Sequence, residues 1–571
     1  MNPIQSFKAL FQEHLDNLIS YASIHPCDRD DLVTFQKDLE PVETLSDLCA
    51  LFKDHNRILP LCMHQAYITE LSRMIGEDKL RAHQILINPT SIPDTPESKE
   101  YIALYDRPTK TQQKGQYVVY IGPGEPHITG GKAENFNQRQ VSVGGDAELI
   151  AYERTHVEAF GKAKITLHNE STCTAKDEAI IIAQGYNRVV AQGNNRVELY
   201  QNSWGISERG KQQWTIHGNS LLYVKAEHKT SDTIQVQMKH RAVLFNASHA
   251  NVIIDHDTMN TYRGKVVECA DNPYIDQELG RLFGERATES LSYSIDKPLP
   301  IDESRELLQS ELPSQVSSRL LRQFHEAQNE QDLCDALACM LIDHPSHTVS
   351  PKVLAKAITS DTLRSYGFYL GPYEYIDERQ GHVFIFGHRI INTQLSDPDH
   401  IYHLYGNSVL VSNNGDKVIA SDHACLVQFE GTQNRVDGCA TALLISKGPI
   451  SASGQGHVCS LGQDNKQEDP WIIYKNQPTH IQLEEHATAL CFGDDTQVVA
   501  KGESRAVCMN GATIDLYDHS EGAAIVGSQV IFKQDSPATK THLLNTPEEV
   551  NQFLAPVSEV NKQEQHRKSG Y

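Results

Sequence analysis

The chain has 571 residues, which is enough for two to four domains. Its 51 basic and 74 acidic side chains give a formal net charge of −23, which argues against nucleic acid or an anionic membrane as a partner. The N-terminal stretch lacks a basic region followed by an apolar run, and no stretch approaches about 18 consecutive apolar residues. Neither a signal peptide nor a transmembrane helix is predicted, so the cytoplasm is the expected location.

Residues 1–90 are expected to form a small helical module. Apolar residues in 6–20 fall on one face of a helix, Thr44 can cap a second helix, and 59–75 predicts a third. Residues 91–116 follow as a predicted linker, because its prolines are unsuited to regular structure.

A pattern of eight residues then recurs without slippage from 140 to 203. It begins with QVSVGGDA and continues with ELIAYERT, HVEAFGKA, KITLHNES, TCTAKDEA, IIIAQGYN, RVVAQGNN and RVELYQNS. Position two is apolar, position four is small or aliphatic, position six favours Gly, Asn or Asp, and position eight is small or an amide. Because apolar and polar residues alternate, each octad predicts a short strand with one buried face, followed by a bend at position six.

Such a unit cannot bury its inner face alone and becomes stable only when equivalent units stack on it. Stacking at ~4.8 Å per layer places equivalent side chains over one another. With two octads to a coil, the product is a flattened β-solenoid whose alanine-lined interior is too narrow for a ligand. A heptad-type helix is excluded because a period of eight does not match 3.5 or 3.6, and the Gly and β-branched residues oppose helix.

The rest of the chain repeats this order of elements. Residues 204–212 are expected to loop out of the first solenoid, which spans 117–268, and 274–372 return to helical spacing. A second solenoid is predicted at 380–536, followed by a short helix and a flexible tail in 537–571. We therefore expect an α+β repeat protein in which two β-solenoid arrays alternate with helical modules, the product of an internal duplication.

The octads at 148, 156 and 196 resemble the A-x-V-x-A-[YF]-x-[NGS] repeat proteins of bacteria and phages. The resemblance covers the two arrays and implies a β-solenoid of microbial or phage origin. It brings no active site.

Twelve cysteines raise the question of disulfides or a metal site. No CxxC pair occurs, and Cys173, Cys491 and Cys508 fall at apolar positions of octads, where a thiol behaves as a small hydrophobe. Reduced structural cysteines, with no metal and no cofactor, are the expectation.

Three features with chemical potential have simpler structural explanations. The Gly/Pro-rich loop 122–131 resembles a phosphate cradle, but its prolines remove backbone donors and no Lys-Ser/Thr follows it. Asp255, His256 and Asp257 could serve acid–base chemistry, although neighbours along a strand face opposite ways. His228, His240 and His256 share position eight and could stack into a metal-binding ladder, whereas solvated turn histidines are the commoner outcome.

Aromatic residues supply the candidate binding site. Tyr152, Phe160 and Tyr200 occupy position five, where an outward-facing row would suit a peptide or glycan, or would stabilise successive coils by stacking. Trp204 and Trp214 bound the expected loop at 204–212 and form the preferred contact site, because loops on a rigid scaffold commonly bind partners. The alternative is that both rings cover the solenoid flank.

A non-catalytic scaffold that binds a protein partner or copies of itself is the function that the sequence favours, in a phage, mobile-element or defence context. The alternative is a β-helix protein that binds or cleaves polysaccharide, although such proteins generally have longer coils and a carboxylate-lined groove. In a third reading the helical segments recruit a partner and the solenoids are spacers. No catalytic residue is assigned.

Overall fold

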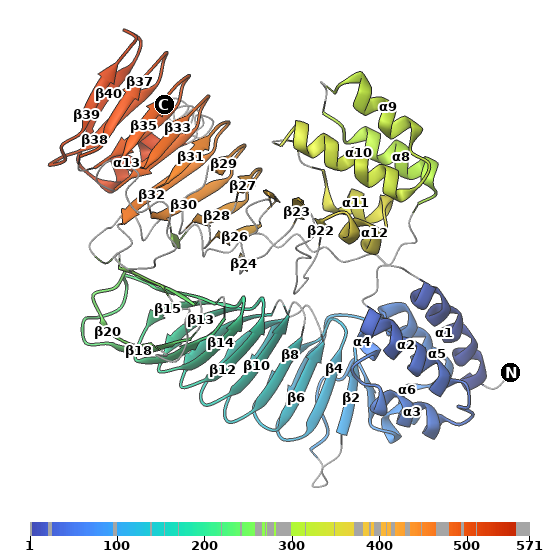
Figure 1. Cartoon of the computed structure of the whole chain (residues 1–571). Coiled ribbons are helices and arrows are strands. Elements are labelled where there is room, and N and C mark those ends of the chain that lie inside the picture. Colours follow the sequence, from blue (N-terminus) through green and yellow to red (C-terminus); the bar gives the residue numbers. More distant parts are fainter. Residues whose placement is uncertain are drawn as a thin grey trace, which may run out of the picture. The chain divides into compact units, whose positions relative to one another are not determined.

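The computed structural model describes residues 3–555, and the chain divides into two compact units, Met1–Leu279 and Gly280–Tyr571. The positions left out of the description within that span are 21–25, 95–99, 137–139, 153–154, 170, 219, 240–241, 257–264, 269, 271–278, 281–298, 314–315, 346, 348, 371–380, 387–389, 393–400, 407, 413–416, 429–433, 447, 464–478, 493–495 and 510. Each unit has helices followed by parallel β-sheets that stack coil upon coil (Figure 1).

The first unit begins with the predicted helical module. Thr44 caps one of its helices through a capping box with Asp47, in which each side chain accepts a hydrogen bond from the other's backbone N–H. The helices are α1 (Pro3–Ser20), α2 (Pro26–Leu39), α3 (Leu45–Asp54), α4 (Leu59–Cys62), α5 (Gln65–Ile75) and α6 (Glu77–Ala82). The helix predicted at 59–75 is divided at 63–64, and α2 was not predicted.

The strands of the first unit alternate between two parallel sheets. Sheet A contains β1 (Ile85–Ile87), β2 (Glu100–Leu104), β4 (Tyr117–Ile121), β6 (Lys132–Phe136), β8 (Glu148–Tyr152), β10 (Lys164–Asn169), β12 (Ile180–Gly185), β14 (Arg196–Gln201), β16 (Gln212–Ile216), β18 (Thr233–Met238) and β20 (Asn251–His256). Sheet B contains β3 (Lys110–Gln113), β5 (Glu125–Ile128), β7 (Gln140–Val143), β9 (His156–Ala159), β11 (Thr172–Asp177), β13 (Arg188–Gly193), β15 (Trp204–Arg209), β17 (Leu221–Val224), β19 (Val243–Asn246) and β21 (Lys265–Glu268).

The octad explains this arrangement residue by residue. Lys164 pairs with Ile180, sixteen residues on, so two octads make one coil. Position six has positive φ in every described octad from 140 to 203, including the non-glycine residues Asn169 and Asp177, as the predicted bend requires. Positions two and four of both sheets form one buried apolar cluster in which Cys173 is included.

Position eight stabilises the turns from inside. The buried Asn187 donates from its amide to the backbone carbonyls of Leu167 and Gln184, at 3.3 and 2.7 Å. Its Oδ1 accepts from the backbone N–H of Ser171 at 3.0 Å. Because a buried backbone group without a partner is costly, this amide holds two successive coils in register.

Two predictions for the first unit were wrong. The proposed linker at 91–116 contains β2 and β3, so the solenoid starts at β1, inside the proposed 1–90 helical module. The segment 204–212 does not loop out: Trp204–Arg209 forms β15 and pairs with β13 and β17. Only one residue, Glu208, is extra, because Ala191 pairs with Ser207 while Gln192 pairs with Arg209, which defines a β-bulge.

The second unit again begins with helices. They are α8 (Ile301–Ser310), α9 (Ser318–Glu326), α10 (Glu330–Asp343), α11 (Pro351–Ala357) and α12 (Ser360–Ser365). Asn329 caps α10 by accepting from the backbone N–H of Asp332. A buried Leu-Cys pair, Leu333 and Cys334, follows the cap, as Leu48 and Cys49 do in α3.

Two more parallel sheets follow in the second unit. Sheet C contains β22 (Phe368–Tyr369), β23 (His382–Phe386), β25 (Ile401–Tyr405), β27 (Lys417–Ala420), β29 (Asn434–Val436), β31 (Pro449–Ala452), β33 (His480–Leu483), β35 (Gln497–Ala500), β37 (Thr513–Leu516) and β39 (Ile531–Gln534). Sheet D contains β24 (Ile390–Asn392), β26 (Val409–Ser412), β28 (Cys425–Gln428), β30 (Thr441–Ser446), β32 (His457–Gln463), β34 (Thr488–Cys491), β36 (Arg505–Cys508), β38 (Glu521–Ile525) and β40 (Lys540–Leu544).

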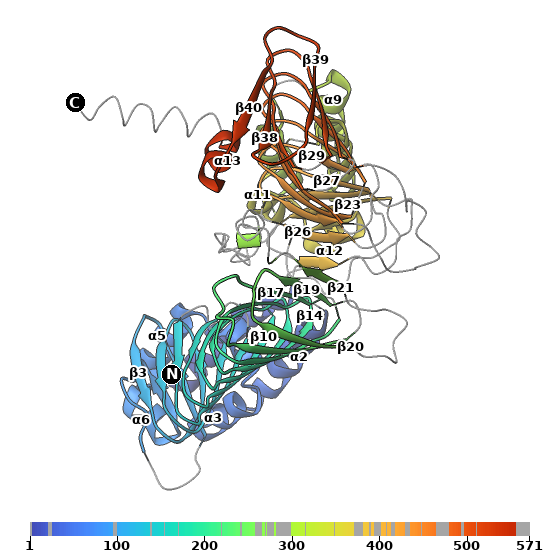
Figure 2. The same ribbon diagram turned by 90° about the vertical axis from the view of Figure 1, so that its left-hand side faces the viewer.

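The C-terminal part differs from the prediction in one respect. The predicted helix is present as α13 (Pro547–Leu554), capped by Thr546, but β40 precedes it inside the segment 537–571 that was expected to hold only a helix and a tail. In Figure 2, β39 and β40 lie at one end of the stack of coils and α13 lies beside the stack. Within the described residues, no helix is both long and apolar enough to cross a membrane.

Candidate functional site

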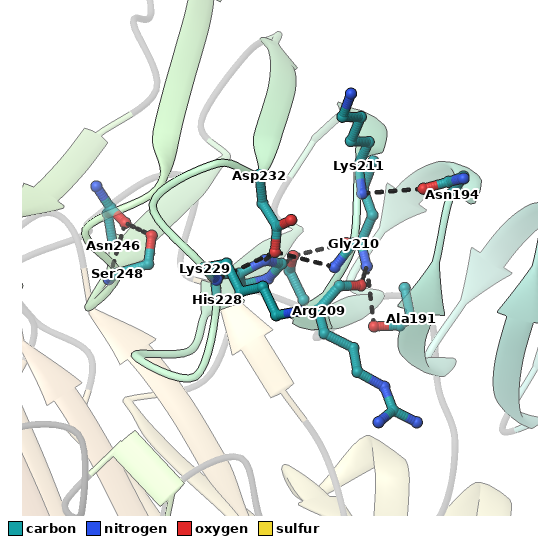
Figure 3. Close-up of polar contacts among 12 residues, drawn as sticks. Ala191, Asn194, Arg209, Gly210, Lys211, His228, Lys229, Asp232, Asn246 and Ser248 are labelled. Carbon is teal, nitrogen blue, oxygen red and sulfur yellow. Dashed lines mark hydrogen bonds and ion pairs between the residues drawn. The ribbon is translucent and has the colours of Figure 1, made fainter.

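Several polar side chains form a hydrogen-bonded cluster where the octad register breaks at β15. The coil containing β15 and β16 carries one extra residue, and the next turn, between β17 and β18, is longer than an octad turn. Figure 3 shows the polar contacts at this break, in which Asp232 lies next to Gly210 and Lys229.

A serine, a histidine and an aspartate form a chain of hydrogen bonds at this place. Ser207 Oγ lies 2.8 Å from His228 Nε2, and His228 Nδ1 lies 3.3 Å from Asp232 Oδ2. The connectivity is that of a hydrolytic triad, so its accessibility and proton positions decide what it can do.

Neither property fits a nucleophile. The Ser207 side chain is fully buried inside the solenoid, so no substrate carbonyl can reach its hydroxyl. Gln212 Nε2 donates to the carbonyls of Ala191 and Arg209, which leaves Gln212 Oε1 to accept from Ser207 Oγ at 2.6 Å. The single hydroxyl proton therefore points to Gln212, and His228 Nε2 acts as the donor to Ser207, which is the reverse of a general base.

The cluster instead fixes the long turn to the solenoid. Asp232 Oδ2 accepts from the backbone N–H groups of Lys229 at 3.1 Å and Gly210 at 3.3 Å, and it lies 3.3 Å from His228 Nδ1. Burial alone would raise the pKa of Asp232, but these hydrogen bonds outweigh it and hold the pKa below its usual range. The expectation of a solvated turn histidine is wrong for His228, whose side chain is buried with these partners. His240 lies outside the described residues and nothing is described of the His256 side chain, so the stacked ladder stays a hypothesis.

Trp214 belongs to the same cluster and is not a contact site. Its side chain is 2 % exposed, and its Nε1–H donates to Gln212 Oε1 at 2.8 Å. A Cβ added to Gly205 would lie 2.4 Å from the Trp214 ring, so the glycine leaves the space that the indole fills. Trp204 is half-buried at the start of β15. The two tryptophans therefore do not bound a projecting loop.

The position-five aromatics stack along the solenoid. Phe136, Tyr152 and His168 follow one another in sheet A, with ring centroids 4.4 and 4.9 Å apart and nearly parallel planes. Further along the same sheet, Tyr200 stacks on His217 at 4.4 Å. Each of these rings presents much of its face to a neighbouring ring, so the row offers mainly ring edges to an outside ligand.

The row is not a single surface of all three predicted residues. Phe160 lies at the end of β9 in sheet B, where Lys176 covers its ring at 4.8 Å, whereas Tyr152 and Tyr200 belong to sheet A. The helical module lies close to the first coils of sheet A, because Asn56, between α3 and α4, donates from its side-chain amide to Glu100 of β2 at 3.4 Å. Burial, followed by the charge of the neighbouring Arg57, lowers the pKa of His168 in the row.

The other candidates are parts of coils. Glu125–Ile128 forms β5 within the loop 122–131 and pairs with β3, so this segment is a strand of the solenoid. Asp255 and His256 lie in β20, where Asp255 is exposed, and Asp257 lies outside the described residues. Among the residues that the structure describes, no group of three or more His, Cys, Asp or Glu side chains is placed to hold a metal ion, and the cysteines there form no disulfide.

A hollow of about 330 Å³ lies between α8 and α10 in the second unit, and Glu330 is one of its lining residues. The Glu330 carboxylate already accepts hydrogen bonds from the backbone N–H and the hydroxyl of Thr359, at 3.1 and 2.6 Å. The Glu330 carboxylate therefore fixes Thr359, the residue before α12.

The last coil of the second unit carries a feature that the sequence analysis missed. Large apolar side chains are exposed there: Val526 (51 %), Ile531 (60 %) and Leu543 (64 %). The signal was present, because IFKQ lies in the last predicted octad and KTHLL continues the pattern beyond residue 536. The array predicted at 380–536 therefore lacks β40, the second strand of the terminal coil.

Comparison of the chain with protein-family models, with curated proteins and with solved structures found no match.

Proposed function

We propose that the chain is a non-catalytic binding protein that presents rigid β-solenoid surfaces to a protein partner or to copies of itself. The observation that carries this proposal is the open end of the second unit, where Ile531 and Leu543 are more than half exposed on the terminal strands β39 and β40. A terminal strand with apolar side chains and free backbone groups is a template for pairing with another chain.

The buried state of the Ser207 hydroxyl also favours binding over catalysis. The arrangement closest to catalytic machinery in the described part of the chain has its proton directed to Gln212 and no access for a substrate. The solenoid interiors are filled by apolar side chains.

Glycan binding is the alternative function, and the aromatic row of sheet A is the observation that favours it. Sugars stack on exposed ring faces, however, and the faces of Tyr152 and His168 lie against neighbouring rings in the row. The row is better explained as cross-strand packing that stabilises the coils.

We further propose that the chain arose by duplication. Each unit runs from helices to a pair of parallel sheets. The capped helices α3 and α10 share the segment Asp-Leu-Cys, at Asp47 and at Asp332, with the Leu and Cys buried in both. The phage or mobile-element setting also belongs to the proposal, and it rests on the resemblance of the octads alone.

Cross-linking in cells that produce the chain tests the binding function. Lys533 and Lys540 lie on the terminal strands, so amine-reactive cross-links from them to another protein, or to an isotope-labelled second copy, are expected. These cross-links should disappear in Leu543→Asp and persist in Leu321→Asp, a matched substitution of an exposed leucine in α9. Specific binding on a glycan array, with cross-links from the two lysines confined to their own chain, would contradict the proposal.

A further inference from the structure

We infer that the open end of the second unit pairs with the same end of another copy of this chain, giving a two-fold symmetric, tail-to-tail dimer. This inference rests on the proposed binding function and names its partner. It follows from the packing, the hydrogen-bond directions and the charges of the last coil.

The interior apolar rows stop abruptly at this end. Phe532 continues the interior row after Ile514 in sheet C, and Leu543 continues the row after Ala524 in sheet D. In the coil beneath, Ile514 is buried and Ala524 is 5 % exposed, whereas Phe532 is half-buried and Leu543 is 64 % exposed. The two other inward positions of the terminal coil are polar, because Gln534 follows Leu516 and Thr541 follows Gly522. Phe532 and Leu543 are thus the apolar inward-facing side chains of this coil, and they lack a further coil above them.

Both terminal strands also have backbone N–H groups that point away from the neighbouring strand, toward the open end. Ile531 and Asp535 donate their N–H groups to Ala512 and Leu516 in β37 and at its edge. Successive N–H groups of a strand point to opposite sides, so those of Phe532 and Gln534 point away from the sheet. On β40, Lys540 donates to Ser520, and by the same rule the N–H groups of Thr541 and Leu543 point to the open side.

The described C-terminal helix does not cover this end. Residues 511–555 are described without a break, and in them α13 turns aside to sheet D. There Arg505 Nη1 donates to the carbonyls of Phe553 at 2.9 Å and Ala555 at 3.3 Å, and His542 packs on the Phe553 ring. The helix therefore fixes the flank of the last coils and leaves their edges open.

The cross-section of the opening favours a second copy as the occupant. A partner must offer two strands at once, and this end of the chain does so, with the apolar Phe532 and Leu543 and the polar Gln534 and Thr541 between the strands. Head-to-tail stacking is blocked, because helices occupy the opposite end of the same sheets, where Phe368, three residues after the end of α12, stacks on Phe384 at 4.6 Å. A two-fold axis normal to the solenoid axis brings the ends together with antiparallel strands, and the assembly closes at two copies.

The lysines of the terminal strands do not oppose this pairing. Lys540 is paired with Glu521 at 3.0 Å and Lys533 with Asp515 at 3.5 Å. Both acids belong to the coil beneath, so each lysine is neutralised within its own chain, and two identical ends can meet without bringing unpaired lysines together. The exposed Asp535, directly after β39, adds one acidic side chain to the rim.

Size-exclusion chromatography with light scattering of the full chain tests the inference. The wild-type chain is expected to show a concentration-dependent mass approaching twice 63.9 kDa. Leu543→Asp, which places a charge in the interface, should weaken dimerisation by at least about tenfold. Thr541→Pro should have a similar effect, because it removes an outward N–H while the inward hydrogen bonds of β40 remain.

The control is Leu321→Asp, which alters an exposed leucine in α9 (46 %, against 64 % for Leu543) and should dimerise as the wild type does. Circular dichroism should show all variants folded, because both leucines are already exposed to water. A wild-type chain that is monomeric throughout, or a dimer that neither Leu543→Asp nor Thr541→Pro weakens, would overturn the inference. If a monomeric chain still cross-links from Lys533 to a different protein, the tail-to-tail dimer is refuted while the binding function stands.

Discussion

Gly205 and Trp214 form a matched pair whose energetic coupling can be measured. Gly205 occupies an interior position between Val189 and Leu222 in sheet B, and Trp214 occupies one between Val197 and Val236 in sheet A. The neighbouring coils have a valine or a leucine at each of these two positions. This coil has the smallest residue, glycine, at one and the largest, tryptophan, at the other. We therefore expect each single substitution to be costly and the double substitution to restore a regular coil.

The magnitudes follow from the packing. In Gly205→Val, the new Cβ would lie 2.4 and 2.8 Å from two atoms of the Trp214 ring and 3.0 Å from Leu199 Cδ1, all in a rigid core. Overpacking of this kind should cost roughly 2–3 kcal/mol. Trp214→Val leaves a cavity and should cost roughly 2–4 kcal/mol. In the double variant the two valines fill the coil as in its neighbours, and the coupling should recover about 3 kcal/mol.

Native-state hydrogen exchange is the suitable assay, because a solenoid loses stability locally and the chain has two units. The opening free energy of peptides covering β14 to β17 should fall in each single variant and recover in the double variant. Peptides from β7 to β9, several coils away, serve as an internal control. If the double variant exchanges as fast as the sum of the single effects requires, the two residues do not compensate each other and the reasoning is wrong.

Three further predictions concern buried polar groups. Ser207 should not react with a serine-directed fluorophosphonate probe, and labelling that Ser207→Ala abolishes would refute its structural role. Asn187→Ala should destabilise β10 to β13 by roughly 2 kcal/mol in hydrogen exchange, because it removes three hydrogen bonds to buried backbone groups, whereas Asn194→Ala, which removes one exposed acceptor, should cost less. Burial and the nearby His382 lower the pKa of His403 to about 3, so the unfolded chain takes up a proton below pH 6.5 that the folded chain does not. The second unit should therefore lose about 1.4 kcal/mol per pH unit between pH 6.5 and 4 in urea unfolding, and His403→Phe should reduce this slope; an unchanged slope would exclude His403 as its source.

The repeat could be predicted from sequence because each position has one physical task. The bend at position six needs a left-handed backbone, and Gly, Asn and Asp supply it most readily, so Asn169 and Asp177 marked the turns as clearly as the glycines did. The helix caps at Thr44 and Thr546 were equally visible, because a hydroxyl three residues before an acidic side chain satisfies free N–H groups locally.

The predictions that were wrong concern segments whose structure depends on partners distant in sequence. Prolines led us to assign 91–116 to a linker, yet β3 is held by neighbours on both sides, including the bridge from Ser91 to Gln112. Gly205 broke the apolar pattern and made a one-residue bulge look like a nine-residue loop, because the indole that compensates for it comes from the facing sheet.

The hydrogen-bonded cluster at the bulge was hidden for the same reason. Ser207, His228 and Asp232 are separated by 21 and 4 residues, and only the irregular coil brings the first two together. Successive strands of sheet B are sixteen or seventeen residues apart there. A prediction based on this coil length, and not on the octad, places Ser207 and His228 in adjacent layers.

The sixteen-residue coil also restricts how the length of this protein can change during evolution. An insertion of one octad would move every later strand from one sheet to the other and reverse which flank carries the aromatic row. An insertion of two octads would leave all lateral surfaces in place and only lengthen the rod by one layer, ~4.8 Å. Viable length variants should therefore differ by whole coils, with single extra residues absorbed as bulges like that at Glu208, while the terminal strands β39 and β40 keep their sequence at whatever distance from the helices they come to lie.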